Sequence, residues 1–292
     1  MKKVALLLPL LFVALSVAAQ SADSIAFVSA RRHKLRLRKA EGYTLCVNLF
    51  NSLQTISVIK YSPKLFSLGI IQPEQRTCVG DIAEQERAVF AINAGYWNRN
   101  NEPSTYVKSR GAEMSLTHPG MLPRVNGLLF MNDSGIEIVC SEDAPEYSSL
   151  VDRLNACENI LACGPVLLDD GKKMSYDHIT SSTDKVLKRK GVFFVRRHPR
   201  SAIGCDREGN IYLVVVDGRA TGKAAGMSIK ELTELCSWLG MVEAMNLDGG
   251  GSSTLWSRKY GVINYPCDNK TFDHEGSRKV SSTLVVNPKK RR

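Results

Sequence analysis

Two aspartates in the C-terminal third of the chain each follow an apolar segment of the kind that forms a buried strand. Asp217 comes directly after residues 211–216, and Asp248 comes directly after residues 241–247. Paired carboxyl groups whose surroundings give them different pKa values can serve as a general acid and a general base. These two aspartates are therefore the first candidates for catalytic residues.

A glycine-rich turn follows the second aspartate. Without Cβ atoms, three successive glycines can adopt positive φ angles and direct their N–H groups toward an anion, and two serine hydroxyls come next. It is not a P-loop, because no Lys-Ser or Lys-Thr pair follows the glycines. An Asp-Gly turn alone favours a structural role, but its combination with residues 215–219 favours a binding site. The candidate binding residues are Gly218, Asn246, Gly249, Gly250, Gly251, Ser252 and Ser253.

The elements that position the two aspartates form a strand–loop–helix–strand unit. Ser228 and Glu231 have the spacing of a helix capping box, and the apolar stripe of residues 229–239 predicts a helix. We expect the two flanking strands to be parallel, with a right-handed crossover. Asp217 and Asp248 would then lie at one edge of the sheet, where ligands bind in open α/β proteins.

Apolar and alternating segments elsewhere predict a mixed β-sheet core and an α+β or α/β fold. Residues 43–50, 55–61 and 88–93 have the composition of strands. Three hairpins are indicated by turn residues: 127–132 with 136–140, residues 160–168 with the turn 169–171, and 201–205 with 210–216. Residues 100–123, rich in Pro, Ser, Thr and Gly, are typical of a long loop.

The N-terminus has the pattern of a secretory signal peptide. Two lysines precede an apolar run that ends at Ala18 and Ala19, small residues that suit a signal peptidase. An uncleaved anchor is the alternative, although the run is shorter than the roughly 20 residues of a membrane span. We expect an exported protein, periplasmic or extracellular, with no later membrane span. The expected organisation is a signal peptide at 1–19, a partly stranded N-terminal extension at 20–80 and the domain with the polar site at 81–292.

The chain is basic, with a formal charge of +10, which removal of the two signal lysines lowers by two. A positive surface favours anionic partners. Solvated surface is the simplest explanation for the basic clusters, which lie at residues 31–39, 188–190, 196–198 and 289–292. Because an exported protein rarely meets nucleic acid, phosphorylated or acidic glycans and membrane surfaces are the expected partners.

Eight cysteines would permit four disulfides in an exported chain. Several lie in apolar segments, where a thiol packs as a small hydrophobic group, so we expect some to be unpaired. Their spacing does not match that of a zinc site.

Four blocks of sequence resemble the phosphodiester glycosidases, the family of the lysosomal enzyme N-acetylglucosamine-1-phosphodiester α-N-acetylglucosaminidase. The resemblance covers the chain from about Ala88 to the C-terminus, and its last block is the most specific. The blocks are residues 91–97, 164–168, 198–204, and 216–218 together with 246–253. The resemblance implies hydrolysis of a sugar 1-phosphodiester, or a phosphorylated glycan, at the glycosidic bond, which releases the sugar and a phosphomonoester.

The resemblance also implies roles for individual residues. Arg200 offers donors for phosphate oxygens, and His198 can carry a proton near neutral pH. Asn93 and Tyr96 would contact the sugar. The two aspartates would stabilise an oxocarbenium-like centre or activate water.

Two other functions remain open on the same residues. In one, Asp217, Asn246 and Asp248 hold a divalent cation and the P–O bond is broken; oxygen ligands of this kind suit Ca²⁺ or Mg²⁺. In the other, the protein is a non-catalytic module that binds envelope glycans and does not need the carboxylates.

Overall fold

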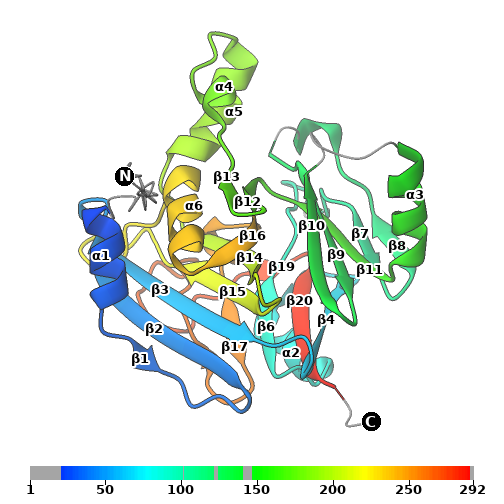
Figure 1. The fold of residues 1–292 in the computed structure, drawn as a ribbon, viewed down its shortest axis with the longest axis horizontal. Helices are drawn as coiled ribbons and strands as arrows, with labels where there is room; N and C mark the ends of the chain where they lie inside the picture. The colour runs from blue at the N-terminus through cyan, green and yellow to red at the C-terminus, as the bar shows by residue number, and fades with distance from the viewer. Residues whose placement is uncertain (1–20, 101, 122–123, 141–146, 290–292) are drawn as a thin grey trace, which may run out of the picture.

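Antiparallel sheets make up most of the fold, and the largest sheet carries helices on one face and two smaller sheets on the other (Figure 1). The computed structural model describes residues 21–100, 102–121, 124–140 and 147–289. The signal peptide expected at residues 1–19 lies outside the described residues. The fold class agrees with the α+β alternative.

Eight strands form the large sheet, and each is antiparallel to its neighbours. In spatial order they are β1 (His33–Lys34), β2 (Ala40–Leu49), β3 (Ser52–Tyr61), β15 (Ile211–Val216), β14 (Arg200–Asp206), β16 (Met241–Asn246), β12 (Val166–Asp169) and β13 (Lys172–Lys173). Alternate residues of β15 enter two different cores: Leu213 and Val215 face the smaller sheets, whereas Val214 and Val216 face the helices. Because both faces are covered, β15 is apolar along its whole length.

The two flanking strands of the strand–loop–helix–strand unit are parallel, as predicted, with another strand between them. β15 and β16 run in the same direction, but they are not neighbours, because β14 lies between them and is antiparallel to both. Within the described residues every strand pair is antiparallel, so the sheet is not mixed in strand direction. The carboxyl ends of β15 and β16 still share one edge, which is the requirement for the two aspartates to meet.

The helices on the outer face of the large sheet bury a separate apolar core that includes Phe27, Phe194 and Leu232. These helices are α1 (Ala22–Ser29), α4 (Asp177–Thr180), α5 (Lys185–Val195) and α6 (Ile229–Trp238). The capping box of Ser228 and Glu231 is present at the start of α6, as predicted.

Two five-stranded sheets cover the inner face. The second sheet has the order β18 (Gly261–Val262), β17 (Leu255–Ser257), β6 (Phe90–Asn93), β20 (Thr283–Pro288) and β4 (Phe66–Ile71). The third has the order β10 (Gly135–Cys140), β9 (Gly127–Asn132), β11 (Asn159–Cys163), β7 (Val107–Ser109) and β8 (Ala112–Ser115). The remaining elements are α2 (Val79–Gln85), α3 (Tyr147–Ala156), the pair β5 (Thr77–Cys78) and β19 (Lys279–Val280), and the 3₁₀ turns η1 (Pro119–Met121) and η2 (Gly250–Ser252).

The hairpins β9–β10 and β14–β15 confirm two of the predicted turns. The segment 160–168 is divided instead, because the chain turns at Gly164 and Pro165 and passes from the third sheet to the large one. Only its end, β12, forms a hairpin with β13 across the predicted turn. The predicted loop 100–123 is also corrected, since it contains the short hairpin β7–β8 and η1.

Residues before the expected boundary at 80 contribute to two sheets. β3 pairs with β15 in the middle of the large sheet, and β4 pairs with β20 in the second. In the described part of the chain, no helix is both long and apolar enough to cross a membrane. Cys163 and Cys236 are buried free thiols, as expected for cysteines within apolar segments.

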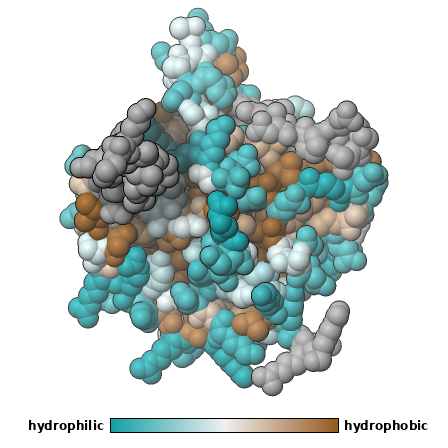
Figure 2. Space-filling view, in the orientation of Figure 1, coloured by the Kyte–Doolittle hydropathy of each residue, from teal (hydrophilic) through white to brown (hydrophobic). Residues whose placement is uncertain are grey.

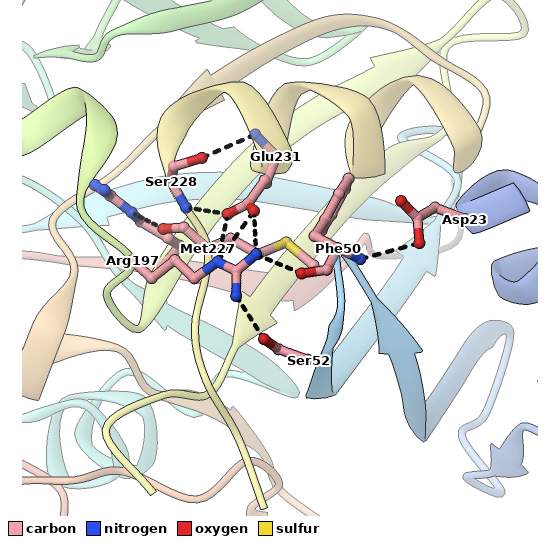
Figure 3. A network of polar contacts seen from close by, with 8 residues as sticks. Asp23, Phe50, Ser52, Arg197, Met227, Ser228 and Glu231 are labelled. Carbon is pink, nitrogen blue, oxygen red and sulfur yellow. Dashed lines mark hydrogen bonds and ion pairs between the residues drawn. The ribbon is translucent and has the colours of Figure 1, made fainter. Parts of the chain in front are cut away.

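Arg197 ties the start of α6 to the turn between β2 and β3 (Figure 3). Its Nε donates to both carboxylate oxygens of Glu231 at 3.0 Å, one Nη donates to the Ser52 hydroxyl at 2.6 Å, and the other Nη donates to the Phe50 carbonyl at 2.7 Å. Phe50 is also held by Asp23, which accepts from its N–H. This network fixes the backbone directly before His198.

We expect Arg197→Lys to lower the free energy of unfolding by about 1–2 kcal/mol, because one ammonium cannot replace a planar set of donors shared among three acceptors. Urea unfolding measures the change. The matched control is Arg189→Lys on the exposed face of α5, which should change stability by less than about 0.5 kcal/mol. Equal effects of the two substitutions would contradict the role given to the network.

Candidate active site

Three chain segments meet at the edge where β15 and β16 end and β14 begins. The register pairs Arg200 with Val216 and Ala202 with Asn246. Asp217 and Asp248 therefore leave the sheet on either side of the segment that enters β14.

Pro199 is the point at which these segments touch. A Cβ on Gly218 would lie 2.8 Å from the Pro199 nitrogen, and a Cβ on Gly249 would lie 2.7 Å from the Pro199 oxygen. A Cβ atom cannot lie within 3.0 Å of a backbone atom, so no residue with a side chain fits at either position. Glycine is required here by the close approach of Pro199, and not by the backbone dihedral angles. The N–H of Gly250 also donates to the Pro199 carbonyl at 2.9 Å.

Asp217 is buried, with 1% of its surface exposed. One carboxyl oxygen accepts hydrogen bonds from Asn264 Nδ2 at 2.8 Å and from the N–H of Tyr265 at 3.0 Å. The other oxygen is buried without a partner. Burial raises the pKa of Asp217 to about 7, and the two hydrogen bonds oppose this only in part.

Asp248 is less enclosed, because part of its surface is exposed. Its Oδ1 accepts from the N–H of Gly249 at 2.8 Å. Burial raises its pKa to about 6, against the lowering influence of the Ser252 hydroxyl, the Gly249 amide and the charges of Arg278 and Arg124. The two carboxyl groups thus titrate near neutral pH, with the more buried group holding its proton to higher pH.

Asn93 lies beneath the site and uses its side chain within the protein. Its Nδ2 donates to the Asp248 carbonyl at 2.6 Å, while its Oδ1 accepts from the Ser201 hydroxyl at 2.7 Å and from the Thr254 N–H at 3.1 Å. It is fully buried. The geometry therefore makes Asn93 a positioning residue for Asp248 and does not support the predicted contact with a sugar.

Tyr96 and Asn246 form a second buried pair. The Tyr96 hydroxyl donates to the Gly164 carbonyl at 2.7 Å and accepts from Asn246 Nδ2 at 2.9 Å. Asn246 also donates to the carbonyls of Gly164 and Leu247. Tyr96 is 4% exposed and Asn246 is fully buried. Both therefore hold the chain around Gly164 in place, and the predicted stacking of Tyr96 on a sugar is not supported.

Arg200 is not placed as a phosphate ligand. It is 1% exposed, its Nε donates to the Met227 carbonyl at 2.8 Å, and one Nη donates to the carbonyls of Phe193 and Arg196. These bonds hold the end of α5 against the sheet. The sequence could not indicate these partners, because the residue type of an arginine does not reveal whether its donors face a ligand or the backbone.

His198 departs from its predicted role as a proton carrier near neutral pH. Burial and the positive charges of Arg200, Arg219, Arg196 and Arg124 lower its pKa to about 4. Its imidazole is therefore neutral at physiological pH. The same arginines show that this part of the site is electropositive.

The expected glycine cradle is partly closed by the protein itself. The N–H groups of Gly249 and Gly250 are bonded to Asp248 and Pro199, so two of the three amides are occupied. Ser252 and Ser253 are each 1% exposed at the end of this turn. The predicted anion nest of successive amides is therefore corrected to a tight turn that positions Asp248.

Arginine side chains supply the positive charge instead. A Cβ on Gly250 would lie 3.0 Å from an Arg219 nitrogen, and a Cβ on Gly251 would lie 2.5 Å from an Arg278 nitrogen. The two guanidinium groups therefore flank the glycine turn. Arg219 directly follows Asp217-Gly218, so the sequence motif around Asp217 could have indicated it. Arg278 lies in no recognisable sequence motif.

Residues 264–278 form a loop over the Asp217 side of the site. Asn264 bonds to Asp217 and also donates to the Ser253 carbonyl. Tyr265 stacks on Phe272 with ring centroids 4.1 Å apart, and the His274 ring lies 4.4 Å from Tyr265. This ring stacking holds Tyr265 in the position from which its backbone N–H donates to Asp217. Sequence reasoning missed this loop, since it has no periodic pattern.

The donor set does not favour the metal-binding alternative. Among the residues that the structure describes, no three His, Cys, Asp or Glu side chains gather in a way that could hold a metal ion. Of the three proposed ligands, Asn246 turns its amide nitrogen toward Tyr96 and Gly164, and Asp217 already accepts two hydrogen bonds.

Comparisons with known proteins agree with the resemblance seen in the sequence. The family model for phosphodiester glycosidases matches residues 86–287. An uncharacterised protein derived from the SPbeta prophage of Bacillus subtilis is 26% identical over 178 residues, which cover 61% of this chain and 26% of that protein. The N-acetylglucosamine-1-phosphodiester α-N-acetylglucosaminidase of Mus musculus is 37% identical over 70 residues, which cover 24% of this chain. The matched part is only 13% of the mouse enzyme.

Two solved structures share the fold. The catalytic domain of zebrafish N-acetylglucosamine-1-phosphodiester α-N-acetylglucosaminidase, auto-inhibited by its pro-peptide, has a TM-score of 0.67 and 17% identity over 92% of this chain and 94% of that one. A hypothetical protein from Synechocystis has a TM-score of 0.67 and 19% identity over 88% of this chain and 63% of that one.

We expect Asp217→Asn to stabilise the protein above neutral pH. Between about pH 4 and pH 7 the unfolded chain releases a proton that folded Asp217 retains, so the free energy of unfolding falls as pH rises. The amide cannot ionise, and the variant should be more stable than the natural protein at pH 8 by up to about 4 kcal/mol. The difference should disappear by pH 4.

Urea unfolding at both pH values measures this effect. Asp170→Asn is the matched control, because the Asp170 side chain is 89% exposed and its substitution should leave the pH dependence unchanged. A stability difference for Asp217→Asn that is the same at pH 4 and pH 8 would show that the carboxyl group is ionised in the folded protein.

Proposed function

The chain belongs to the phosphodiester glycosidase family, and from this premise we propose that it hydrolyses a sugar 1-phosphodiester to the free sugar and a phosphomonoester. One observation carries the proposal: two carboxyl groups with raised pKa values stand at one edge of the sheet, beside arginines that suit a phosphate. The name of the mouse relative makes an N-acetylglucosamine 1-phosphodiester the first substrate to test.

Asp248 is the proposed general base or carboxylate partner of the sugar. It is the more exposed of the two acids and, with a pKa of about 6, is largely ionised at neutral pH. In the ionised form it takes the proton of the attacking water or stabilises positive charge at the anomeric carbon. The bond from this carbon to the phosphate oxygen breaks, and its electron pair leaves with the phosphomonoester.

Asp217 is the proposed acid. Its pKa of about 7 keeps much of it protonated at neutral pH, and its second oxygen has no partner in the protein. That oxygen is buried in the structure, so transfer of its proton to the departing phosphate oxygen requires the covering residues to move when the substrate binds. Because a phosphate is already a good leaving group, this proton contributes less than the carboxylate of Asp248.

The arginines are proposed to bind the phosphodiester. Arg219 and Arg278 flank the turn after Asp248, and Arg124 lies near enough to lower the pKa values of Asp248 and His198. Arg278 is already paired with the Asp268 carboxylate, so Arg219 and Arg124 are the first candidates. Guanidinium groups match the geometry of phosphate oxygens. Neutral His198 is available there as a hydrogen-bonding group but not as a proton carrier.

We also propose that the enzyme acts outside the cytoplasm, on the strength of the N-terminal signal pattern. Among extracytoplasmic phosphodiesters, sugar phosphates of the cell envelope or of phosphorylated glycans fit an electropositive site. The non-catalytic alternative gives no reason for two acids with desolvated carboxyl groups at one edge, and this desolvation has a cost in stability.

Incubation with an N-acetylglucosamine 1-phosphodiester in ¹⁸O-labelled water should give free sugar that carries the label. Asp248→Asn should lower kcat by roughly 10²-fold to 10⁴-fold, since the amide keeps the hydrogen bond from Gly249 but cannot accept a proton. Mass spectrometry of both products measures the label. The matched control Asp170→Asn should retain full activity.

Label in the phosphate would show P–O cleavage and contradict the proposed glycosidase. Failure to turn over any member of a panel of sugar 1-phosphodiesters, with the folded state verified by circular dichroism, would support the non-catalytic alternative.

The dependence of kcat/KM on pH should be a narrow bell. Activity should rise with pH through about 6, where Asp248 loses its proton, and fall through about 7, where Asp217 loses its own. In Asp217→Asn the falling limb should be lost, because no proton remains to be released. A falling limb that persists unchanged in this variant would assign the acid to another group.

A further inference from the structure

A helical hairpin projects from the body of the molecule beside the edge that carries the site (Figure 1). It consists of α4, α5 and the residues between them, 177–195, and is called the arm here. Its root is fixed by Phe194, which packs on Tyr176 with ring centroids 4.9 Å apart. Arg200 also donates to the carbonyl of Phe193.

The outer face of α5 combines basic and aliphatic side chains. Its three valines have large exposed fractions for apolar residues: 52% for Val186, 38% for Val192 and 58% for Val195. Lys185, Lys188 and Arg189 are exposed on the same helix, and α5 contains no acidic residue. Figure 2 shows hydrophilic and hydrophobic surface side by side on this arm.

The arm, residues 177–195, carries four basic and two acidic residues, a formal net charge of +2. Asp184, at the N-cap of α5, accepts hydrogen bonds from the N–H groups of Val186 and Leu187. Asp177 on α4 accepts from the Ser175 hydroxyl. Glu234 on α6 forms an ion pair with Lys173 at 2.6 Å.

We propose that the arm binds the surface of a bilayer that contains anionic phospholipids. An amphipathic helix that is rich in basic residues and exposes apolar side chains can lie in the membrane interface, where lysine and arginine pair with lipid phosphates and the apolar groups enter the acyl boundary. The charge selects an anionic surface. The exposed valines select a bilayer over a soluble polyanion, since only a bilayer offers an apolar layer beneath its phosphates. The proposal does not depend on the enzymatic activity.

Co-sedimentation of the mature protein with vesicles tests the arm directly. The protein should bind vesicles of phosphatidylglycerol and phosphatidylcholine at least about tenfold more tightly than vesicles of phosphatidylcholine alone. Lys188→Glu/Arg189→Glu should weaken binding to the anionic vesicles by about tenfold or more. Val192→Asn/Val195→Asn should also weaken it, by several-fold, without any change in charge.

The matched control is Arg38→Glu/Lys64→Glu, which makes the same change in net charge at exposed positions beside β2 and β4, away from the arm. It should bind almost as well as the natural protein. Thermal unfolding verifies that each variant is folded.

Three results would overturn the proposal: equal binding to neutral and anionic vesicles, an equal loss in the control and arm variants, or unaltered binding of the valine variant. The last result would show that the arm binds lipid phosphates by charge alone and that its valines do not insert into the bilayer.

Discussion

The close approach of three backbone segments around Pro199 is the constraint on which the candidate site depends. Gly218 and Gly249 each leave no room for a Cβ atom against Pro199. Through these contacts the segment entering β14 fixes the separation of the chain ends that carry Asp217 and Asp248. Side chains such as Asn93 and Asn246 then complete the site from below, by bonding to carbonyl groups of the same turns. The site is thus set by backbone packing first and by side-chain hydrogen bonds second.

Charged groups around Pro199 are distributed unevenly. Burial raises the pKa values of both aspartates. For Asp248 it does so even though the charges of Arg278 and Arg124 lower the pKa, so desolvation outweighs the attraction between opposite charges there. The histidine responds in the opposite direction, because burial and like charge both disfavour its cationic form. Arg278 already forms an ion pair with Asp268, and a substrate phosphate would supply negative charge for Arg219 and Arg124. An anionic substrate would therefore relieve this electrostatic imbalance.

The sequence predicts part of this arrangement well. The shared edge of Asp217 and Asp248 could be inferred because each follows an apolar strand and a capped helix connects the two strands. The position of β14 between the two strands could not be inferred, because periodicity reveals that a strand is buried but not which strand lies beside it. Residue type misled the interpretation of Arg200, Tyr96 and Asn93, whose polar groups bond to the protein itself. Asn264 and Arg278 were missed, since they reach the site from an irregular loop.

The order of strands has a consequence for how the chain folds. β3 pairs with β15, more than 140 positions later in the sequence, and β20 near the C-terminus lies between β4 and β6 from the first third. Such pairings have high contact order, which slows folding because long loops must close before the contacts form. In a chain emerging from a ribosome, one edge of β3 would lack its partner until β15 arrives, and β4 and β6 would lack theirs until β20 arrives. Binding by a chaperone during this interval would protect the exposed strand edges from aggregation.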